Sequence, residues 1–329
     1  MIRSAAWRSH SCGDLRAENV GQQVTLCGWV DNRRNHGAIH FVDLRDRYGI
    51  TQLVVDGDAA SNAADQMSGL HQEDVVQAKG VVRMRIEGQR NPDRVTGDVE
   101  VLVTSVEVLS SSKTLPFEIA DHIDVPEDTR LKYRYLDMRR SPLQRALQLR
   151  SKANNAIRNS LCAQEFVEVE TPMLTRSTPE GARDYLVPSR MRPGSWFALP
   201  QSPQIFKQLC MVGGLDRYFQ IARCMRDEDL RADRQPEFTQ LDIEMSFVDE
   251  EDVYASVESV MQDVYQAVHE TELVAPFERM PYNEAIALYA SDKPDLRNPL
   301  QIVDVADVAG TLDFVVFDNV LESKGWIRA

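Results

Sequence analysis

Five short runs of apolar and β-branched residues, separated by turn signals, occupy the first 110 residues of the chain. The runs cover residues 24–30, 38–46, 50–56, 74–85 and 97–109, and a helix is predicted over 59–70. The polar residues 32–37 and 88–97 are expected to form loops between strands. Three strands, a helix and two strands is the order of an OB-fold, a small barrel that binds oligonucleotides on one face and two loops. Other five-stranded barrels give the same pattern, so periodicity alone leaves the barrel type open.

The periodicity breaks between residues 110 and 142, where three serines, three prolines and the run LKYRYLDMRR predict a hinge. A helix is then predicted from Ser141, which can cap it, with Pro142 at its first position. One stripe of this helix holds Leu143, Leu147, Ile157 and Leu161.

Two strand candidates, 216–228 and 237–248, flank the polar segment 227–236, as an antiparallel hairpin requires. A strand is also predicted over 166–174 and a helix over 250–269. In the second hairpin strand, alternation places Gln240, Asp242 and Glu244 on one face. A single strand of this kind is more often a solvated sheet face.

Charged side chains converge at the end of that hairpin. Arg226, Asp227 and Glu228 end the first strand, and the loop adds Arg231, Arg234 and Gln235. Guanidinium groups can fork onto phosphate oxygens, so the loop is a candidate nucleotide-phosphate site. Taken alone, an arginine-rich loop is more often a solvated turn.

Composition excludes several classes of protein. No apolar run approaches the roughly 20 residues that cross a bilayer, and the amino terminus has no apolar core of a secretory signal, so a cytoplasmic protein is predicted. The five cysteines have no zinc-ligand spacing and are expected to be free thiols. The net charge of -14 argues against a nucleic-acid partner. Local clusters of arginine, at 33–34, 83–85, 130–140 and 223–234, nevertheless allow a polyanion to bind at chosen points.

Several long motifs resemble those of the bacterial aspartyl-tRNA synthetases, which are class II aminoacyl-tRNA synthetases. The run RCMRDEDLRADRQPEFTQLDIE is similar to their motif 2, and FVEVETPML is similar to motif 1. The segments TPEGARDYLVPSR and ALPQSPQIFKQL resemble their substrate-binding segments, and SDKPDLRNP resembles the approach to the bacterial insertion domain. The resemblance extends from about Cys12 to the end of the chain.

The resemblance implies a multidomain chain. It predicts an all-β OB-fold anticodon-binding domain over 1–112, a hinge over 113–141, and an α+β class II catalytic domain, an antiparallel sheet with helices, beginning over 142–295. Residues 296–329 would start the insertion domain. No stretch resembles motif 3, so the catalytic domain is expected to be incomplete at its carboxyl end.

The resemblance also implies an aspartate-binding site. Lys207 is expected to pair with the side-chain carboxylate of L-aspartate, while Glu180 and Asp242 hold its ammonium group. Ser202 and Gln204 are expected to orient the substrate.

For ATP, the resemblance implies that Arg226 is catalytic, binding both the aspartate and the α-phosphate where negative charge develops. The other expected ATP-binding residues are Asp227, Glu228, Gln235 and Phe238. An ionised carboxylate attacks without a general base. Magnesium is expected on the phosphates, but the family's ligands for it lie outside this chain, so no metal site is predicted within it.

In the barrel, the resemblance marks Arg34, Phe41 and Gln52 as anticodon readers, because unpaired bases can stack on an aromatic ring and be read at their edges. Without the family, Phe41 is better explained as a core residue of a barrel strand. His36 and Gly88 resemble the pattern of enzymes that charge tRNA(Asn) as well as tRNA(Asp). Pro172 is expected at a homodimer interface.

Two functions are therefore in contention. One is an aspartate-tRNA ligase that makes aspartyl-adenylate and transfers aspartate to tRNA(Asp). The other is a truncated paralogue without catalysis that binds tRNA or dimerises. Lys207 and Arg226 favour the ligase, since a binding module has no use for them. The chain alone is expected to be inactive, because it lacks motif 3.

Overall fold

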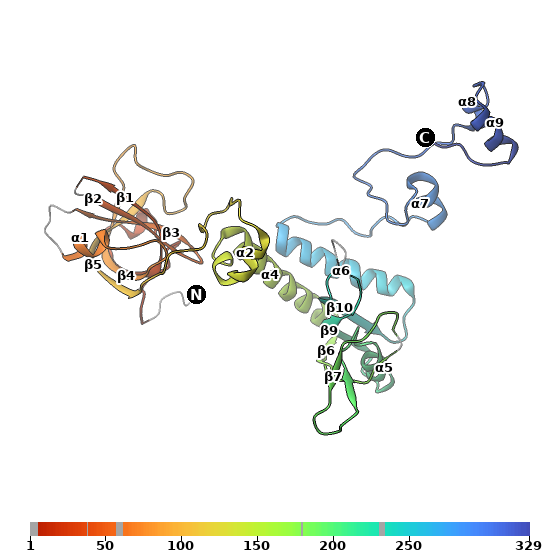
Figure 1. Ribbon diagram of the computed structural model, residues 1–329, viewed down its shortest axis with the longest axis horizontal. Helices are drawn as coiled ribbons and strands as arrows, with labels where there is room; N and C mark the ends of the chain where they lie inside the picture. Colours follow the sequence, from red (N-terminus) through yellow and green to blue (C-terminus); the bar gives the residue numbers. More distant parts are fainter. Residues whose placement is uncertain (1–5, 38, 57–61, 179, 230–233) are drawn as a thin grey trace. The chain divides into compact units, whose positions relative to one another are not determined.

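The computed structural model describes residues 6–37, 39–56, 62–178, 180–229 and 234–329. The chain divides into two compact units, Met1–Arg150 and Ser151–Ala329 (Figure 1).

The first unit contains a closed five-stranded barrel with the strand order β1-β2-β3-β5-β4. A short 3-10 helix, η1 (Ala17–Asn19), precedes it. Its elements are β1 (Gln23–His36), β2 (Ile39–Asp46), β3 (Gly49–Asp56), α1 (Asn62–Ser68), β4 (Val75–Met84) and β5 (Val99–Ser110). The predicted order of three strands, one helix and two strands is confirmed, and the closed barrel is the predicted OB-fold.

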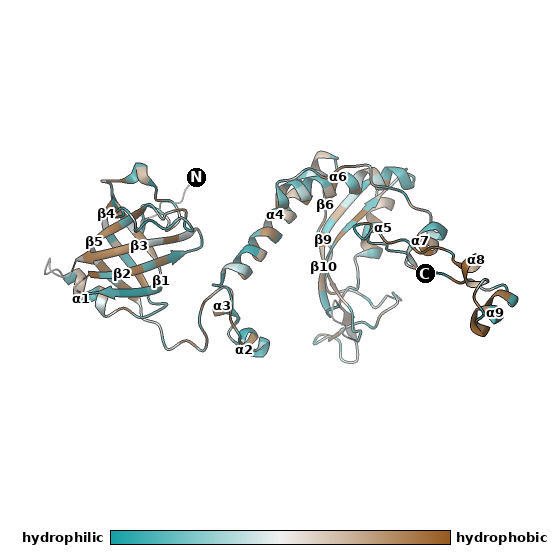
Figure 2. Cartoon of the chain, turned by 90° about the horizontal axis from the view of Figure 1, so that it is seen from above, coloured by the Kyte–Doolittle hydropathy of each residue, from teal (hydrophilic) through white to brown (hydrophobic). Residues whose placement is uncertain are grey.

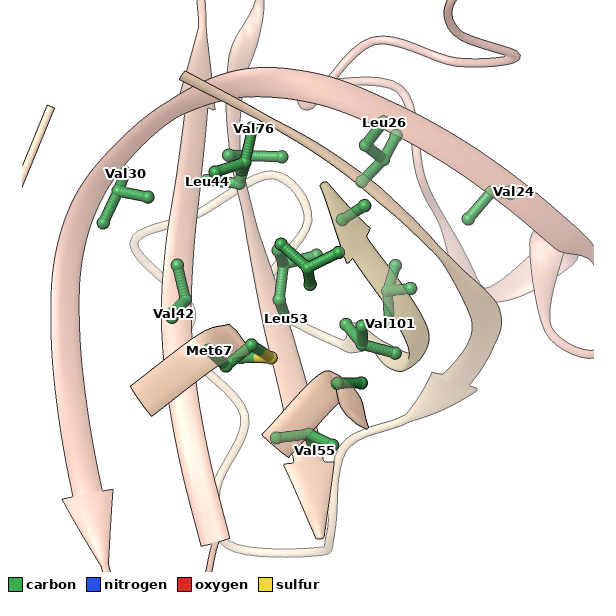
Figure 3. Close-up of a cluster of buried hydrophobic side chains, with 14 of the residues drawn as sticks. Val24, Leu26, Val30, Val42, Leu44, Leu53, Val55, Met67, Val76 and Val101 are labelled. Carbon is green, nitrogen blue, oxygen red and sulfur yellow. The ribbon is translucent and has the colours of Figure 1, made fainter. Parts of the chain in front are cut away.

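Alternate residues of every barrel strand point into one apolar core. Val24, Leu26 and Val30 of β1 meet Val42 and Leu44 of β2 there (Figure 3). Helix α1 adds Met67, which is 1% exposed, so the helix contributes to this core. Because inward and outward positions alternate, the residues between these apolar ones lie on the outer face.

The loop predicted over 32–37 is wrong. Strand β1 continues to His36 and pairs with β2 in the register Arg34↔Phe41 and His36↔Ile39, after a bulge between Val30 and Asn32. Polar side chains tolerate a strand here because they point to solvent, and the tight turn needs little more than Gly37, whose φ is 62°. The arginines of this segment therefore lie on the barrel face.

The linker after the barrel is structured. It forms α2 (Glu127–Lys132) and α3 (Arg134–Asp137) around a small cluster of Phe117, Ile119 and Leu136. Asp137, whose side chain is 1% exposed, accepts ion pairs from Arg130, Arg134 and Arg140. A buried carboxylate surrounded by cations stabilises this fold of the linker.

The second unit contains a three-stranded sheet of order β10-β9-β6 and a two-stranded sheet, β7-β8. Its elements are α4 (Ser141–Ala163, which starts in the first unit), β6 (Val167–Glu168), β7 (Leu186–Pro188), β8 (Trp196–Ala198), α5 (Gln204–Val212), β9 (Arg217–Met225), β10 (Glu237–Met245), α6 (Glu250–His269), α7 (Tyr282–Tyr289), α8 (Ala306–Ala309) and α9 (Val315–Glu322). The predicted hairpin is confirmed, with Asp242 opposite Gln220 in β9. The helix predicted over 250–269 is also confirmed, and Asp249 caps it.

The strand predicted over 166–174 is much shorter than expected. Only Val167 and Glu168 pair, in parallel, with β9, and the amide of Val169 adds one bond to the carbonyl of Phe219. Pro172 has no amide hydrogen to donate, so it cannot extend the pairing.

Helices α4 and α6 pack on one face of the three-stranded sheet. Leu161 of α4, Phe166, Phe219 of β9 and Val260 of α6 form the buried cluster. Of the predicted stripe on α4, Ile157 and Leu161 join it, whereas Leu147 is 47% exposed. In Figure 2, α9 is coloured largely as hydrophobic, although its Val315 and Val316 are exposed. Among the described residues, no helix is long and apolar enough to cross a membrane.

Candidate functional site

The barrel carries a polar hollow of about 690 Å³ on its outer face. The three predicted anticodon readers, Arg34, Phe41 and Gln52, all line it, and so do His36 and Gly88. Three neighbouring strands bring the readers together, because β1 pairs Arg34 with Phe41 and β2 places Gln52 opposite Asp43, two residues from Phe41. The structure therefore brings the three predicted residues together around one hollow.

Hydrogen bonds fix the orientation of Gln52, which is buried. Its Nε2 donates to Glu100 Oε2 over 2.8 Å, and its Oε1 accepts from Arg34 Nη2 over 3.2 Å. Arg83 Nε also donates to Glu100, over 2.8 Å. The side-chain amide of Gln52 therefore borders the hollow with its oxygen and its nitrogen each fixed by one hydrogen bond. A group that reads a base edge needs such a fixed orientation.

Phe41 lies outside the buried core cluster of the barrel and is half-buried. Its ring meets His36 edge-on, with the ring centroids 6.0 Å apart. One ring face towards a polar hollow is the arrangement that base stacking uses. Gly88 has a φ of 85°, with open space where a side chain would begin.

In the second unit, Lys207 of α5 reaches two carboxylates of β10. Its Nζ lies 2.9 Å from Asp242 Oδ1 and 3.2 Å from Glu244 Oε2. Residues two apart on a strand share a face, so the alternation seen in the sequence builds this contact. Burial favours the neutral amine, but the hydrogen bonds and charges of Asp242 and Glu244 outweigh it and raise the pKa of Lys207 above its usual 10.5.

Asp242 has a further acceptor without a partner. Its Oδ2 is buried and makes no hydrogen bond to the described residues. Burial raises the pKa of Asp242 above 3.8, Lys207 lowers it, and the charges of Glu244 and Glu180 raise it further. An unsatisfied buried carboxylate oxygen is costly, so this position favours an external donor such as an ammonium group.

Glu180, Ser202 and Gln204 adjoin this centre. Ser202 Oγ donates to Glu180 Oε2 over 2.9 Å. Gln204 begins α5 three residues before Lys207, which places both on one side of the helix. The buried Gln201 bonds the backbone of Ala182 and so holds the loop that carries Glu180.

A separate cavity of about 310 Å³ lies at the hairpin end. The guanidinium of Arg226 stacks over the ring of Phe238, 5.0 Å from its centroid, and Arg234 pairs with Glu228 at 3.5 Å. The lining residues are Arg226, Glu228, Asp229, Arg234, Gln235, Pro236 and Phe238. The cavity thus joins cations for an anion with an aromatic ring for a flat group.

Three residues named from the sequence are not among the described residues that line this cavity. Asp227 does not line this cavity; it lies 3.8 Å from Arg183 in an exposed pair. Arg231 lies outside the described residues. Pro172 borders a different groove of about 910 Å³, together with Met191 and Trp196, which are exposed.

The sequence interpretation missed five residues of these sites. Glu244 shares the face of Asp242, so alternation alone could have assigned it. The carboxylates Asp43 and Glu100 alternate with core residues along their strands. Arg83 lies near the end of β4, and Arg94 lies in the connection from β4 to β5. The partners of these four residues are distant in the sequence, so no local pattern reveals the ion pairs. Among the described residues, no group of three His, Cys, Asp or Glu side chains could hold a metal ion.

Comparison with known proteins links both units to one family. The family model described as "tRNA synthetases class II (D, K and N)" matches residues 126–319, and "OB-fold nucleic acid binding domain" matches residues 24–109. Two curated relatives are called "Aspartate--tRNA(Asp/Asn) ligase". The relative from Thermodesulfovibrio yellowstonii is 50% identical over 98% of this chain and 54% of its own length. The relative from Moorella thermoacetica is 54% identical over 98% of this chain and 53% of its own length. The chain spans about half the length of the curated relatives it matches.

Solved structures share the fold. The asparaginyl-tRNA synthetase from Pyrococcus horikoshii, complexed with asparaginyl-adenylate, superimposes with a TM-score of 0.69 over 82% of this chain and 59% of that one, at 23% identity. An aspartyl-tRNA synthetase from Leishmania major gives a TM-score of 0.70 over 82% of this chain and 54% of that chain, at the same identity. At this identity the likeness is one of fold alone.

Proposed function

The chain belongs to the class II tRNA synthetases of the D, K and N group, and we propose that it carries the anticodon-binding and amino-acid-binding parts of an aspartate-tRNA ligase. The observation that carries the proposal is the centre in which Lys207 meets two carboxylates, one with an unpartnered buried oxygen. The relatives named as aspartate-tRNA ligases, at 50% and 54% identity, support the same substrate.

The centre recognises both ends of free aspartate. The ammonium of Lys207 pairs with the side-chain carboxylate of the substrate, exchanging part of its bonding to Asp242 and Glu244. The substrate ammonium takes the open oxygen of Asp242 and the carboxylate of Glu180. Asparagine would offer Lys207 a neutral amide in place of a carboxylate, which is the basis of selection for the acid.

ATP binds in the cavity at the hairpin end. Phe238 stacks on the adenine, Glu228 and Gln235 bind the nucleotide, and Arg226 neutralises the α-phosphate. The α-carboxylate of aspartate attacks that phosphorus, forming a mixed anhydride and releasing pyrophosphate. The described residues gather no metal ligands, so we assign no step here to magnesium, which the family uses on the phosphates.

The barrel binds the anticodon of tRNA(Asp). Phe41 stacks on a base, and Gln52 and Arg34 bond base edges, since all three line one hollow. We propose that tRNA(Asn) is accepted as well, because its anticodon differs at one base and the hollow has open space at Gly88.

The domain division follows from these roles. We propose anticodon binding over 1–112, a hinge over 113–141, catalytic residues over 142–295 and an insertion beginning at 296. The exposed apolar groove at Pro172 is the proposed surface for a second copy, giving a homodimer. The cytoplasm is the compartment in which this activity would serve translation.

Binding of a stable aspartyl-adenylate analogue to the 329-residue chain tests the proposal by calorimetry. We expect Lys207→Met to weaken binding by about 100-fold, because it removes a buried charged hydrogen bond to the ligand. Ligand selection against an asparaginyl-adenylate analogue should be lost at the same time. A matched control is Lys152→Met, a lysine on the exposed part of α4. Equal affinity of Lys207→Met and the parent chain would contradict the proposal and favour the second candidate, a tRNA-binding module without catalysis.

A further inference from the structure

Arg94 fastens the connection between β4 and β5 to the barrel face. Its Nη2 donates a hydrogen bond to Asp43 Oδ2 over 3.0 Å, and its Nη1 lies 2.9 Å from Asp43 Oδ1 as an ion-pair contact, so the guanidinium faces both oxygens of the carboxylate. The side chain of Asp43 is 1% exposed, and its buried Oδ1 has no hydrogen-bond partner among the described residues. The hydrogen bond to Asp43 raises the pKa of Arg94 above its usual value, although burial opposes the shift.

The same carboxylate also holds Arg34. Nη2 of Arg34 donates to Asp43 Oδ2 over 3.4 Å while it donates to Gln52 over 3.2 Å. Asp43 and Gln52 face each other across β2 and β3. One buried carboxylate therefore connects a proposed anticodon reader with a residue of the neighbouring loop.

Backbone hydrogen bonds tie together residues 91–97, the second half of that loop. The amide of Asn91 donates to the carbonyl oxygen of Gly97 over 3.1 Å, and the amide of Gly97 donates to the carbonyl oxygen of Arg94 over 2.9 Å. A Cβ at Gly97 would lie 1.7 Å from the backbone oxygen of Asn91, so the two segments of the loop approach each other as closely as glycine permits. A shift of Arg94 therefore carries residues 91–97 with it.

We propose that Arg94 is a positioning residue for anticodon recognition: through Asp43 it sets the place of residues 91–97 at the hollow and orients Arg34 toward Gln52. The inference rests on the proposed reading of an anticodon in this hollow. Loss of Arg94 frees residues 91–97 and leaves Arg34 as the remaining arginine on Asp43. Binding of the anticodon then weakens, and the preference between two similar anticodons changes.

The test uses the full 329-residue chain with Arg94→Met, Arg94→Lys, Asp43→Asn, and the double variant Asp43→Asn with Arg94→Met. Arg47→Met is the matched control, because Arg47 is an exposed arginine on the turn between β2 and β3 and does not line the hollow. Two measurements are made: hydrogen exchange of the loop amides without RNA, and the Kd for RNA stem-loops that carry the aspartate or the asparagine anticodon.

We expect Arg94→Met to speed exchange at Asn91 and Gly97 and to raise the Kd by about tenfold, the usual scale of coupling through a shared network. Arg47→Met should change the Kd by less than about threefold, because it removes one exposed charge outside the hollow. Arg94→Lys keeps the charge but loses the planar guanidinium that faces both oxygens of Asp43, so it should recover part of the affinity. The double variant should bind no worse than Asp43→Asn, because both substitutions break one connection.

Equal losses for Arg47→Met and Arg94→Met would mean that only general attraction to phosphate is involved, which overturns the inference. Additive losses in the double variant, or faster exchange with unchanged binding, would also overturn it. If thermal melting shows that Asp43→Asn does not fold, the three arginine variants still decide. A parent chain that binds neither stem-loop would remove the proposed anticodon site itself, whereas tight parent binding with an unaffected Arg94→Met removes this inference alone.

Discussion

The barrel and the β9–β10 hairpin differ in how far each satisfies its own interactions. The barrel strands close on one another, so each of them has two neighbours. Its buried cluster draws residues from all five strands and α1. In the sheet of the second unit, β10 pairs with β9 alone among the described strands, and the buried cluster consists of Leu161, Phe166, Phe219 and Val260.

The two sites differ in the same way. In the barrel hollow, Gln52 is bonded to Arg34 and Glu100, so its orientation exists before any ligand arrives. On β10, Asp242 Oδ2 is buried and has no hydrogen-bond partner among the described residues, as Asp43 Oδ1 has none in the barrel. The difference lies in the support: the closed fold orients the Gln52 amide within about 110 residues, whereas Asp242 lies on a strand with one described neighbour.

The largest expected effect concerns catalysis by the 329-residue chain. Aspartate-dependent exchange of pyrophosphate into ATP should be at least about 10⁴-fold slower than for the full-length Moorella thermoacetica relative, because no stretch of the 329 residues resembles motif 3 and each electrostatic contact absent from such a site costs about 3 kcal/mol. The relative serves as the positive control in the same assay. Clear exchange by the chain would break the comparison, since the open sheet would then hold a sufficient site.

The next effect concerns Phe41. Phe41→Ala should weaken binding of the anticodon stem-loop by roughly tenfold or more, because a stacked base contributes about 1 to 3 kcal/mol. The melting temperature of the barrel should change little, since Phe41 lies outside the core cluster. Tyr48→Ala removes a half-exposed aromatic ring outside the hollow and is the control. Unchanged binding with a lowered melting temperature would make Phe41 a structural residue.

A smaller effect concerns the choice between two tRNAs. Stem-loops with the aspartate and asparagine anticodons should bind the chain within about fivefold of each other, which is close to 1 kcal/mol. A stem-loop with an unrelated anticodon gives the background affinity. Strong preference for the aspartate stem-loop would mean that the hollow around His36 and Gly88 discriminates, and tRNA(Asn) would no longer be a proposed partner.

The smallest effect is a pH dependence of the second unit. Asp242 has a pKa above 3.8, because burial disfavours its charged form. A raised carboxylate pKa gives stability that is present below pH 3.8 and is lost as pH rises through the folded-state pKa. The unfolding free energy of the parent chain, relative to that of Asp242→Asn, should therefore fall as pH rises from 3.8 through the folded-state pKa of Asp242. Urea titrations at several pH values would measure this change. Asp249→Asn, at an exposed cap, is the control; a flat difference for Asp242→Asn would mean that Lys207 fully compensates for burial.

The sequence alone predicted most of the elements and named the residues of the proposed site. Alternation of apolar residues is a local property, so the barrel order, the hairpin and the helix over 250–269 could be predicted without a structure. Long motifs located Lys207, Arg226 and Asp242, because residues of one motif remain on neighbouring parts of the hairpin and α5.

The tertiary structure decided what depends on partners far apart in the chain. Polar residues 32–36 read as a loop, but pairing with β2 makes them a strand, since outward positions of a barrel accept charge. Pairing also restricted the strand predicted over 166–174 to Val167 and Glu168. Asp43 meets Arg94 across 51 residues of sequence, and closure of the barrel alone brings them together. Periodicity records which face a side chain takes, whereas its contacts depend on which strands become neighbours.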